Sequence, residues 1–171
     1  CDFETVPATG SYPLPDCWTK GPQHANSPYR NTGANAYQGN GFLYFYTVNT
    51  AAMPPMDRSA INLSTTQVSF YARGAGFVLQ VGMMTNPNDA STFVQIGNDI
   101  ILDNNYGKYE IPLASYTGTG SYVAFRNTAN NYIYVDNVTL EEVPACARPV
   151  FLAITDSLTT QNSLQLTWTE T

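Results

Sequence analysis

Apolar residues alternate with polar residues along most of this chain, and no stretch repeats its apolar residues with the period of an amphipathic helix. Alternation with a period of two places one face of an extended strand in a core and leaves the other face in solvent. Clusters of glycine, proline and asparagine separate the runs, as expected for turns between short strands. The runs predicted to form strands are 41–49, 66–73, 76–84, 92–96, 108–112, 121–126 and 132–141. The chain is therefore expected to be all-β, with two sheets packed face to face as a β-sandwich.

Two other stretches are expected to lie outside these strands. Residues 1–40 are rich in proline, glycine and asparagine, and are expected to form a long ordered loop. Residues 86–91 are expected to form one turn of helix at most.

The charge balance excludes several classes of partner. Only 7 Lys and Arg oppose 13 Asp and Glu, which gives a net charge of −6 and leaves no basic stripe for a phosphate backbone. Nucleic acid is therefore not an expected partner, and neither is an anionic membrane surface. No run of apolar residues is long enough to insert into a membrane. Charged residues make up only 12% of the chain, so hydroxyl and amide groups must solubilise the surface, as in extracellular β-proteins that contact sugars, cell walls or proteins.

The alternation breaks once, around Asp136. Ile133 and Val135 occupy odd positions, whereas Val138 and Leu140 occupy even ones. If all four point inward, one extra residue is inserted near Asp136, and such a bulge re-aims side chains. The alternative keeps the even-numbered residues on one inner face, with Asp136 aligned among them. Either arrangement leaves the carboxylate between apolar neighbours, where a cation or a cluster of hydrogen bonds is needed to offset its desolvation.

The two ends of the chain resemble the ends of one known extracellular domain. The matching stretches are Cys1-Asp2-Phe3-Glu4 with Asp16-Cys17-Trp18, and Tyr134-Val135-Asp136-Asn137-Val138 followed by Cys146. Together they resemble the MAM domain and its bacterial relatives, the choice-of-anchor and cleaved-adhesin modules. The resemblance implies that residues 1–146 form a jelly-roll (concanavalin-like or MAM-like) β-sandwich.

The same resemblance implies a metal site. In these folds the first and last strands lie side by side, so Glu4 and Asp136 would share one ion. Calcium is the expected ion, because it takes carboxylate oxygens together with backbone and amide carbonyl oxygens. The loop 35–41 would add carbonyl ligands, and Asn40 is the preferred candidate. The alternative is that Asp136 accepts hydrogen bonds from backbone N–H groups.

The three cysteines cannot all pair within one chain. MAM domains bridge the positions that match Cys1 and Cys17, so the resemblance implies a Cys1–Cys17 disulfide, worth about 3 kcal/mol for a loop of this length. A Cys1–Cys146 bridge is the rival pairing, and three reduced, buried thiols are the remaining alternative.

Residues 147–171 change pattern and resemble the start of a fibronectin type III domain. Two strands are expected, over 151–155 and 163–169, and Trp168 would be the core tryptophan of that domain. Its other strands are missing from this sequence. The segment is therefore predicted to form an orphan β-hairpin, which is marginally stable without a partner. Neighbouring domains of the same chain are thus expected partners.

The chemistry of the chain does not indicate an enzyme. The single histidine, His24, lies in a proline-rich loop without a nucleophile motif, which argues against a serine triad and against a catalytic zinc. The paired carboxylates of a glycoside hydrolase are also missing, because Glu141 and Glu142 are adjacent and face opposite sides of a strand.

Tyrosines supply the remaining signal, because sugar-binding modules and protein interfaces both use exposed tyrosine rings. The predicted ligand-binding residues are Tyr29, Tyr37, Tyr106 and Tyr109. We expect a non-catalytic adhesion or recognition module of an exported or cell-surface bacterial protein, stabilised by calcium, that binds a glycan or a host protein. The alternatives are a carbohydrate-binding module appended to a glycoside hydrolase and a purely structural spacer.

Overall fold

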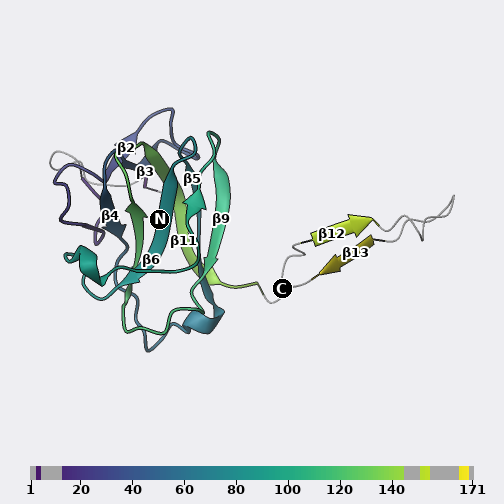
Figure 1. The fold of residues 1–171 in the computed structure, drawn as a ribbon. Coiled ribbons are helices and arrows are strands. Elements are labelled where there is room, and N and C mark those ends of the chain that lie inside the picture. The colour runs from purple at the N-terminus through teal and green to yellow at the C-terminus, as the bar shows by residue number, and fades with distance from the viewer. Residues whose placement is uncertain (1–2, 5–12, 145–150, 155–165, 170–171) are drawn as a thin grey trace.

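The computed structural model describes residues 3–4, 13–144, 151–154 and 166–169, the last two ranges by their backbone. Two antiparallel sheets face each other, so the predicted all-β sandwich is confirmed (Figure 1). The first sheet contains β1 (Thr19–Lys20), β4 (Asn49–Ala52), β10 (Tyr122–Asn127), β6 (Val78–Met84) and β7 (Val94–Gln95) in that order, with β8 (Ile100–Ile101) also paired to β6. The second sheet contains β2 (Tyr29–Thr32), β3 (Gly41–Phe45), β11 (Ile133–Glu142), β5 (Thr66–Arg73) and β9 (Gly107–Pro112) in that order.

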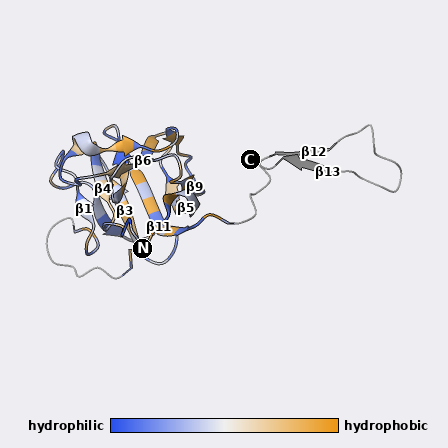
Figure 2. Cartoon of the chain, turned by 90° about the horizontal axis from the view of Figure 1, so that it is seen from below, coloured by the Kyte–Doolittle hydropathy of each residue, from blue (hydrophilic) through white to orange (hydrophobic). Residues whose placement is uncertain are grey.

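The inward-facing residues of the two sheets form one core. Along β11, hydrophobic residues are interspersed with hydrophilic ones (Figure 2), as in a strand with one face buried. Phe70 of the second sheet packs edge-on against Phe125 of the first, with ring centroids 5.0 Å apart. Trp18 stacks on Phe125, and Phe3 lies 5.4 Å from Trp18, so the start of the chain is fastened into the same core.

Residues 1–40 were predicted to be a loop, and this prediction is wrong in part. β1 and β2 lie in that stretch and pair with β4 and β3. Both strands are short, with 2 and 4 residues, and lie at sheet edges. Such strands leave no long alternating run in the sequence.

The predicted strand over 41–49 is divided in the structure. β3 ends at Phe45 and belongs to the second sheet, whereas β4 begins at Asn49 and belongs to the first. The buried Asn49 amide fixes the change of sheet, because its Nδ2 donates to the main-chain oxygens of Gly21, His24 and Ser27. Its pairing also explains why a polar residue is tolerated there.

The predicted strand 66–73 is confirmed with the same ends as β5, and the others are confirmed with shifted ends. The run 92–96 shortens to β7, because Ala90–Thr92 forms a short 3-10 helix, η2, capped by the Asp89 side chain. This is the single helical turn that the sequence predicted over 86–91, displaced slightly along the chain. A second 3-10 helix, η1 (Leu63–Thr65), precedes β5. Within the described residues, no helix has the length and apolar character needed to cross a bilayer.

The predicted C-terminal hairpin is also confirmed. β12 (Phe151–Ile154) and β13 (Leu166–Thr169) pair with each other as a separate two-stranded sheet. The predicted boundary between residues 146 and 147, together with Cys1 and Cys146, lies outside the described residues. The fibronectin-like role of Trp168 stays a prediction.

Candidate binding face

The bulge that the broken alternation predicts lies next to Asp136. The register between β11 and β5 shifts between Asp136 and Thr139, and Asn137 adopts a left-handed backbone with φ of 49°. Val135 and Val138 are consequently both fully buried, although one is at an odd and the other at an even position. The bulge therefore lets apolar side chains enter the core both before and after the polar residues Asp136 and Asn137.

The Asp136 carboxylate is fully buried and accepts hydrogen bonds from main-chain N–H groups. Its Oδ2 accepts from Tyr37 at 2.9 Å and from Gln38 at 3.2 Å, and its Oδ1 accepts from Asn137 at 2.7 Å. Burial raises the pKa of this carboxyl group, the three N–H groups oppose the rise, and the charge of Glu4 adds to it. The hydrogen-bond cluster that the sequence left open as an alternative is thus present.

Glu4 holds the next residues of the same loop. Its carboxylate accepts from the N–H groups of Asn40 and Gly41 at 2.8–3.0 Å. Gly39 has φ of 66°, and a Cβ placed there would lie 2.4 Å from Glu4 Oε1, so glycine is required at this position for two reasons. Glu4 and Asp136 together fasten the loop 37–41 to the start of the chain and to β11.

The structure therefore brings together the predicted metal ligands Glu4, Asp136 and Asn40. Asn40 contributes its N–H to Glu4, and its main-chain oxygen accepts from Gly33. Among the residues that the structure describes, no group of three or more His, Cys, Asp or Glu side chains is arranged to hold a metal ion. The two neighbouring carboxylates are of an atom type that calcium prefers. The calcium ion itself stays a proposal.

Cys17 is exposed, and it forms no disulfide with any described residue. The proposed Cys1–Cys17 bridge stays a prediction because Cys1 lies outside the described residues.

The outer side of the second sheet carries a group of tyrosines. Leu43, Phe45, Ile133 and Val135 face the core, so the residues between them face outward. We call this group the tyrosine face, and its members are Tyr29 of β2, Tyr44 of β3, Tyr46 directly after β3, Tyr132 directly before β11 and Tyr134 of β11.

Strand pairing brings the members of the tyrosine face into contact. Tyr29 lies opposite Tyr44, and Tyr44 lies opposite Tyr134. The ring of Tyr44 lies 5.5 Å from that of Tyr29 and 5.1 Å from that of Tyr134, and it is parallel to that of Tyr132 at 6.1 Å. Burial among these rings raises the pKa of Tyr44. Tyr132 is 57% exposed, so the face combines a packed centre with an open edge.

Arg73 of β5 extends the row, because it lies opposite Tyr134 in the register. Its guanidinium carbon lies 4.4 Å from the ring centroid of Tyr134 and 5.2 Å from that of Tyr106. These are cation–π distances. The row therefore runs across four neighbouring strands from Tyr29 to a cation.

The predicted ligand residues separate into three groups. Tyr29 belongs to the tyrosine face. Tyr37 and Tyr106 lie beside it, where Tyr37 stacks on Tyr71 at 3.7 Å and the Tyr106 hydroxyl donates to the main-chain oxygen of Asn35 at 2.7 Å. Burial raises the pKa of Tyr106 to about 12, against the opposing effect of Arg73.

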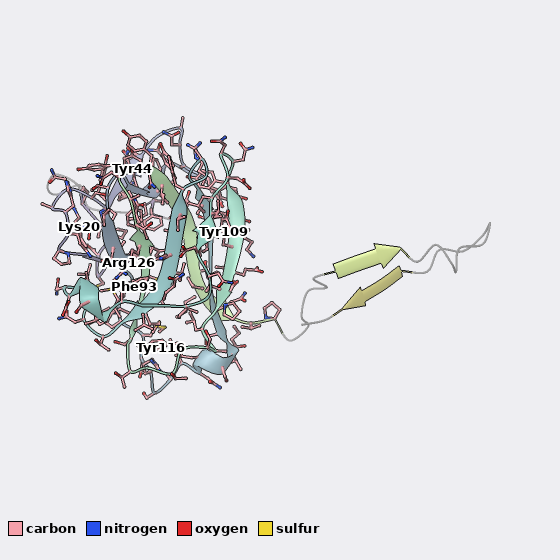
Figure 3. All side chains as sticks on the ribbon, in the orientation of Figure 1. Lys20, Tyr44, Phe93, Tyr109, Tyr116 and Arg126 are labelled. Carbon is pink, nitrogen blue, oxygen red and sulfur yellow. The ribbon has the colours of Figure 1, made fainter. Side chains whose placement is uncertain are left out.

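Tyr109 occupies a different environment. It stacks against Phe70 and packs on the core from β9, away from Tyr44 (Figure 3). Sequence reasoning did not single out Arg73, Tyr44 and Tyr46 as site residues. The alternation in β3 and β5 already placed Tyr44 and Arg73 outward, but only the strand order shows that they share a row.

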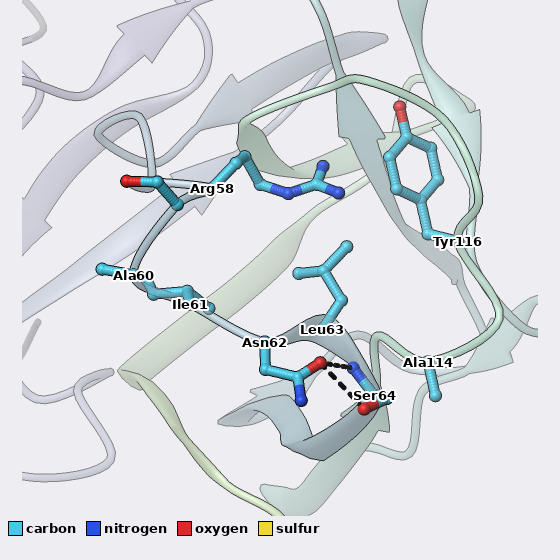
Figure 4. Close-up of a pocket in the computed structure, with 9 residues that line it drawn as sticks. Arg58, Ala60, Ile61, Asn62, Leu63, Ser64, Ala114 and Tyr116 are labelled. Carbon is cyan, nitrogen blue, oxygen red and sulfur yellow. Dashed lines mark hydrogen bonds between the residues drawn. The ribbon is translucent and has the colours of Figure 1, made fainter.

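Two pockets lie away from the tyrosine face. One of about 490 Å³ lies beside η1 (Figure 4), where Arg58 donates to the main-chain oxygen of Gly120 and lies 5.9 Å from the Tyr116 ring. These contacts close the turn before β10. The other, of about 420 Å³, lies on the first sheet beside Arg126, which stands 3.7 Å over the Phe93 ring (Figure 3).

No protein-family model and no curated protein matches the chain. Solved structures do share its fold. The K2 cleaved adhesin domain of Lys-gingipain has a TM-score of 0.61 and 14% identity, over 82% of this chain and 95% of that one. The CBM22-1 xylan-binding domain of Xyn10C from Paenibacillus barcinonensis has a TM-score of 0.52 and 16% identity, over 85% and 93%. A Stig cyclase from Fischerella sp. TAU has a TM-score of 0.50 and 16% identity, over 84% and 94%.

At these identities the likeness shows the fold. The chain is a jelly-roll β-sandwich similar to cleaved adhesin domains and carbohydrate-binding domains, as the cleaved-adhesin part of the sequence resemblance implied. The MAM and fibronectin parts of that resemblance stay predictions.

Proposed function

We propose that this domain is a non-catalytic recognition module that binds a glycan on its tyrosine face. The observation that carries the proposal is the row of outward rings on neighbouring strands, Tyr29, Tyr44 and Tyr134, with the exposed Tyr132 beside it. The faces of sugar rings carry C–H groups that pack on aromatic rings, while the tyrosine hydroxyl groups offer hydrogen bonds to sugar hydroxyls. A row of rings that extends over neighbouring strands fits an extended chain of sugars better than a single small molecule.

The fold supports this proposal. A xylan-binding domain shares the jelly roll with this chain over most of its length. A cyclase shares it too, so the fold alone does not decide between binding and catalysis. The chemistry of the face favours binding, because three of the roughly four lone-pair sites on Asp136, a buried acid beside the face, already accept hydrogen bonds from main-chain N–H groups.

Adhesion to a protein is the second candidate function. The adhesin domain has a higher TM-score than the xylan-binding domain. Tyrosine is also enriched at protein interfaces, where its ring supplies area and its hydroxyl a hydrogen bond. In either case we place the domain outside the cell, as part of an exported or cell-surface protein.

We further propose that a calcium ion stabilises the binding face from its edge. Glu4 and Asp136 would hold the ion through their carboxylates, and main-chain oxygens of the loop 35–41 would complete the oxygen shell. The ion would neutralise the charge of Glu4, which otherwise raises the pKa of the neighbouring Asp136. It would thereby stiffen the loop that carries Tyr37, next to the tyrosine face.

A glycan array tests the proposed function. The wild-type protein should bind a defined set of oligosaccharides, and Tyr44→Ala and Tyr132→Ala should each weaken that binding about tenfold or more. Tyr122→Ala is the matched control, because Tyr122 is a half-buried tyrosine in β10 of the other sheet. Binding to extracellular proteins without glycan binding would favour adhesion, and binding to neither would leave only a spacer role.

A further inference from the structure

The guanidinium group of Arg73 contacts two tyrosine rings. Its guanidinium group lies between the rings of Tyr106 and Tyr134, at 5.2 Å and 4.4 Å from their centroids. Two rings on one guanidinium group restrict its rotation and remove water from its faces, which leaves the edge with its N–H groups for polar contacts. The side chain is thus oriented before any ligand arrives.

The hydrogen bonds of Arg73 are incomplete. Its Nη2 donates to the Asn35 side chain at 2.6 Å, whereas its Nε is buried without a hydrogen-bond partner. Within the described part of the chain, no carboxylate lies at ion-pairing distance from Arg73. A buried cationic donor without an acceptor is costly, so such a group calls for a physical explanation.

The other described arginines donate to main-chain oxygens, although Arg126 shares with Arg73 a buried Nε that has no hydrogen-bond partner. Arg30 donates to the main-chain oxygens of Phe3 and Glu4, and Arg58 donates to that of Gly120. Arg126 donates to the main-chain oxygen of Ala90. Those contacts fix loops to the sandwich. Arg73, in contrast, donates to the side chain of Asn35 and not to a main-chain oxygen.

A small pocket opens beside Arg73 at the exposed edge of the tyrosine face. Its volume is about 180 Å³, and its walls include Arg73, Tyr132 and Tyr134. Gly74 and Ala75, which directly follow β5, and Asn104 also line it. A sugar ring lying on Tyr132 would therefore bring its substituents next to a cation.

The acids nearest this pocket do not compete for Arg73. Asp136 is buried, and its oxygens accept from the N–H groups of Tyr37, Gln38 and Asn137. Asp103 contacts this region through its main-chain oxygen, which accepts from Gly74 and Ala75. The charge of the guanidinium group thus remains available to an incoming anion.

We propose that Arg73 makes the tyrosine face selective for acidic sugars, by binding the carboxylate of a uronic acid residue. This inference rests on the proposed glycan-binding function. A uronic acid carries its carboxylate directly on the pyranose ring, so the ring can pack on Tyr132 while the carboxylate reaches Arg73. A guanidinium group matches a planar carboxylate better than an ammonium group does. The face would then read both the shape and the charge of the glycan.

The test compares matched acidic and neutral ligands. Oligogalacturonides and the same oligosaccharides with their carboxyl groups reduced to alcohols are titrated into the wild-type protein by calorimetry. The wild type should bind the acidic form about tenfold or more tightly, since a hydrogen bond to a charged group contributes about that factor. Arg73→Gln should abolish this preference, so that the acidic and the neutral forms bind with equal affinity. Arg73→Lys, which keeps the charge without the planar fork, should retain only part of it.

Arg58→Gln is the matched control, because Arg58 also lies over a tyrosine ring and its replacement changes the net charge equally. It should leave the preference for the acidic form intact, and thermal unfolding shows whether each variant is folded. Equal binding of both forms by the wild type, or a preference for sulfated neutral sugars over uronates, would overturn the inference and leave the glycan-binding function standing. Binding to no glycan at all would overturn both.

Discussion

Replacing Gly39 by alanine should break the contact between the Glu4 carboxylate and the loop 37–41. Gly39 has φ of 66°, and an alanine Cβ would lie 2.4 Å from Glu4 Oε1. The left-handed backbone alone costs about 1–2 kcal/mol for an L-residue. The clash additionally forces the Glu4 carboxylate away from the N–H groups of Asn40 and Gly41. Asn40 is exposed, so water replaces its acceptor, and the loss at the part-buried Gly41 contributes about 1.5–3 kcal/mol.

Gly97→Ala is the matched control for this substitution. Gly97 has φ of 69°, and a Cβ placed there meets nothing within 4 Å, so only the backbone cost applies. Thermal unfolding should therefore give a Tm for Gly39→Ala that is about 5–10 °C below that of Gly97→Ala. In a Glu4→Ala background the clash is already gone, and Gly39→Ala should cost no more than Gly97→Ala does. Equal effects of the two glycine substitutions in the wild type, or strict additivity with Glu4→Ala, would refute the reasoning.

Three further outcomes are expected. Calcium should raise the Tm and a chelator should lower it, because an ion at a hundredfold excess over its Kd adds about 2.7 kcal/mol to the free energy of unfolding. Glu4→Ala and Asp136→Ala should each remove most of this shift in Tm, and an unchanged Tm would argue against the ion. Mass spectrometry without reductant should find the peptides of Cys1 and Cys17 linked, whereas two free thiols would reject the bridge. Burial raises the pKa of Tyr106 from 10.0 to about 12, so its contribution to stability is complete below pH 10 and is lost as the pH rises toward 12; the difference between the ultraviolet titration curves of the wild type and Tyr106→Phe isolates this group, and a midpoint of that difference near pH 10 would contradict the burial of the hydroxyl.

The sequence predicted the features that depend on alternation. The change from odd to even apolar positions around Asp136 predicted the bulge, because a continuous core requires an extra residue there. The resemblance of the two chain ends predicted that Glu4 and Asp136 are neighbours, and both carboxylates hold the loop 37–41. Such patterns can be interpreted from the sequence because burial of one strand face determines which positions must be apolar.

Features that depend on strand order were not accessible in the same way. The run 41–49 has no glycine or proline after Gly41 to mark an interruption, yet it changes sheets at Asn49, whose amide is held by three main-chain oxygens of an earlier loop. Tyr44 and Arg73 are far apart in the sequence and become neighbours only because β11 lies between β3 and β5. Tyr109 and Tyr29 were both predicted as ligand-binding residues from their places near strand ends, but the ring of Tyr109 packs against Phe70.

Ring-selective NMR of the tyrosines tests the proposed binding face most directly. The chain has 12 tyrosines, and labelling them at the ring carbons gives a signal on each side of the sandwich. On titration with the tightest glycan from the array, the resonances of Tyr44, Tyr132 and Tyr134 should shift, whereas those of Tyr109 and Tyr122 should not. Shifts confined to Tyr122, on the opposite sheet, or no shift of any tyrosine while the glycan binds, would contradict the proposed face.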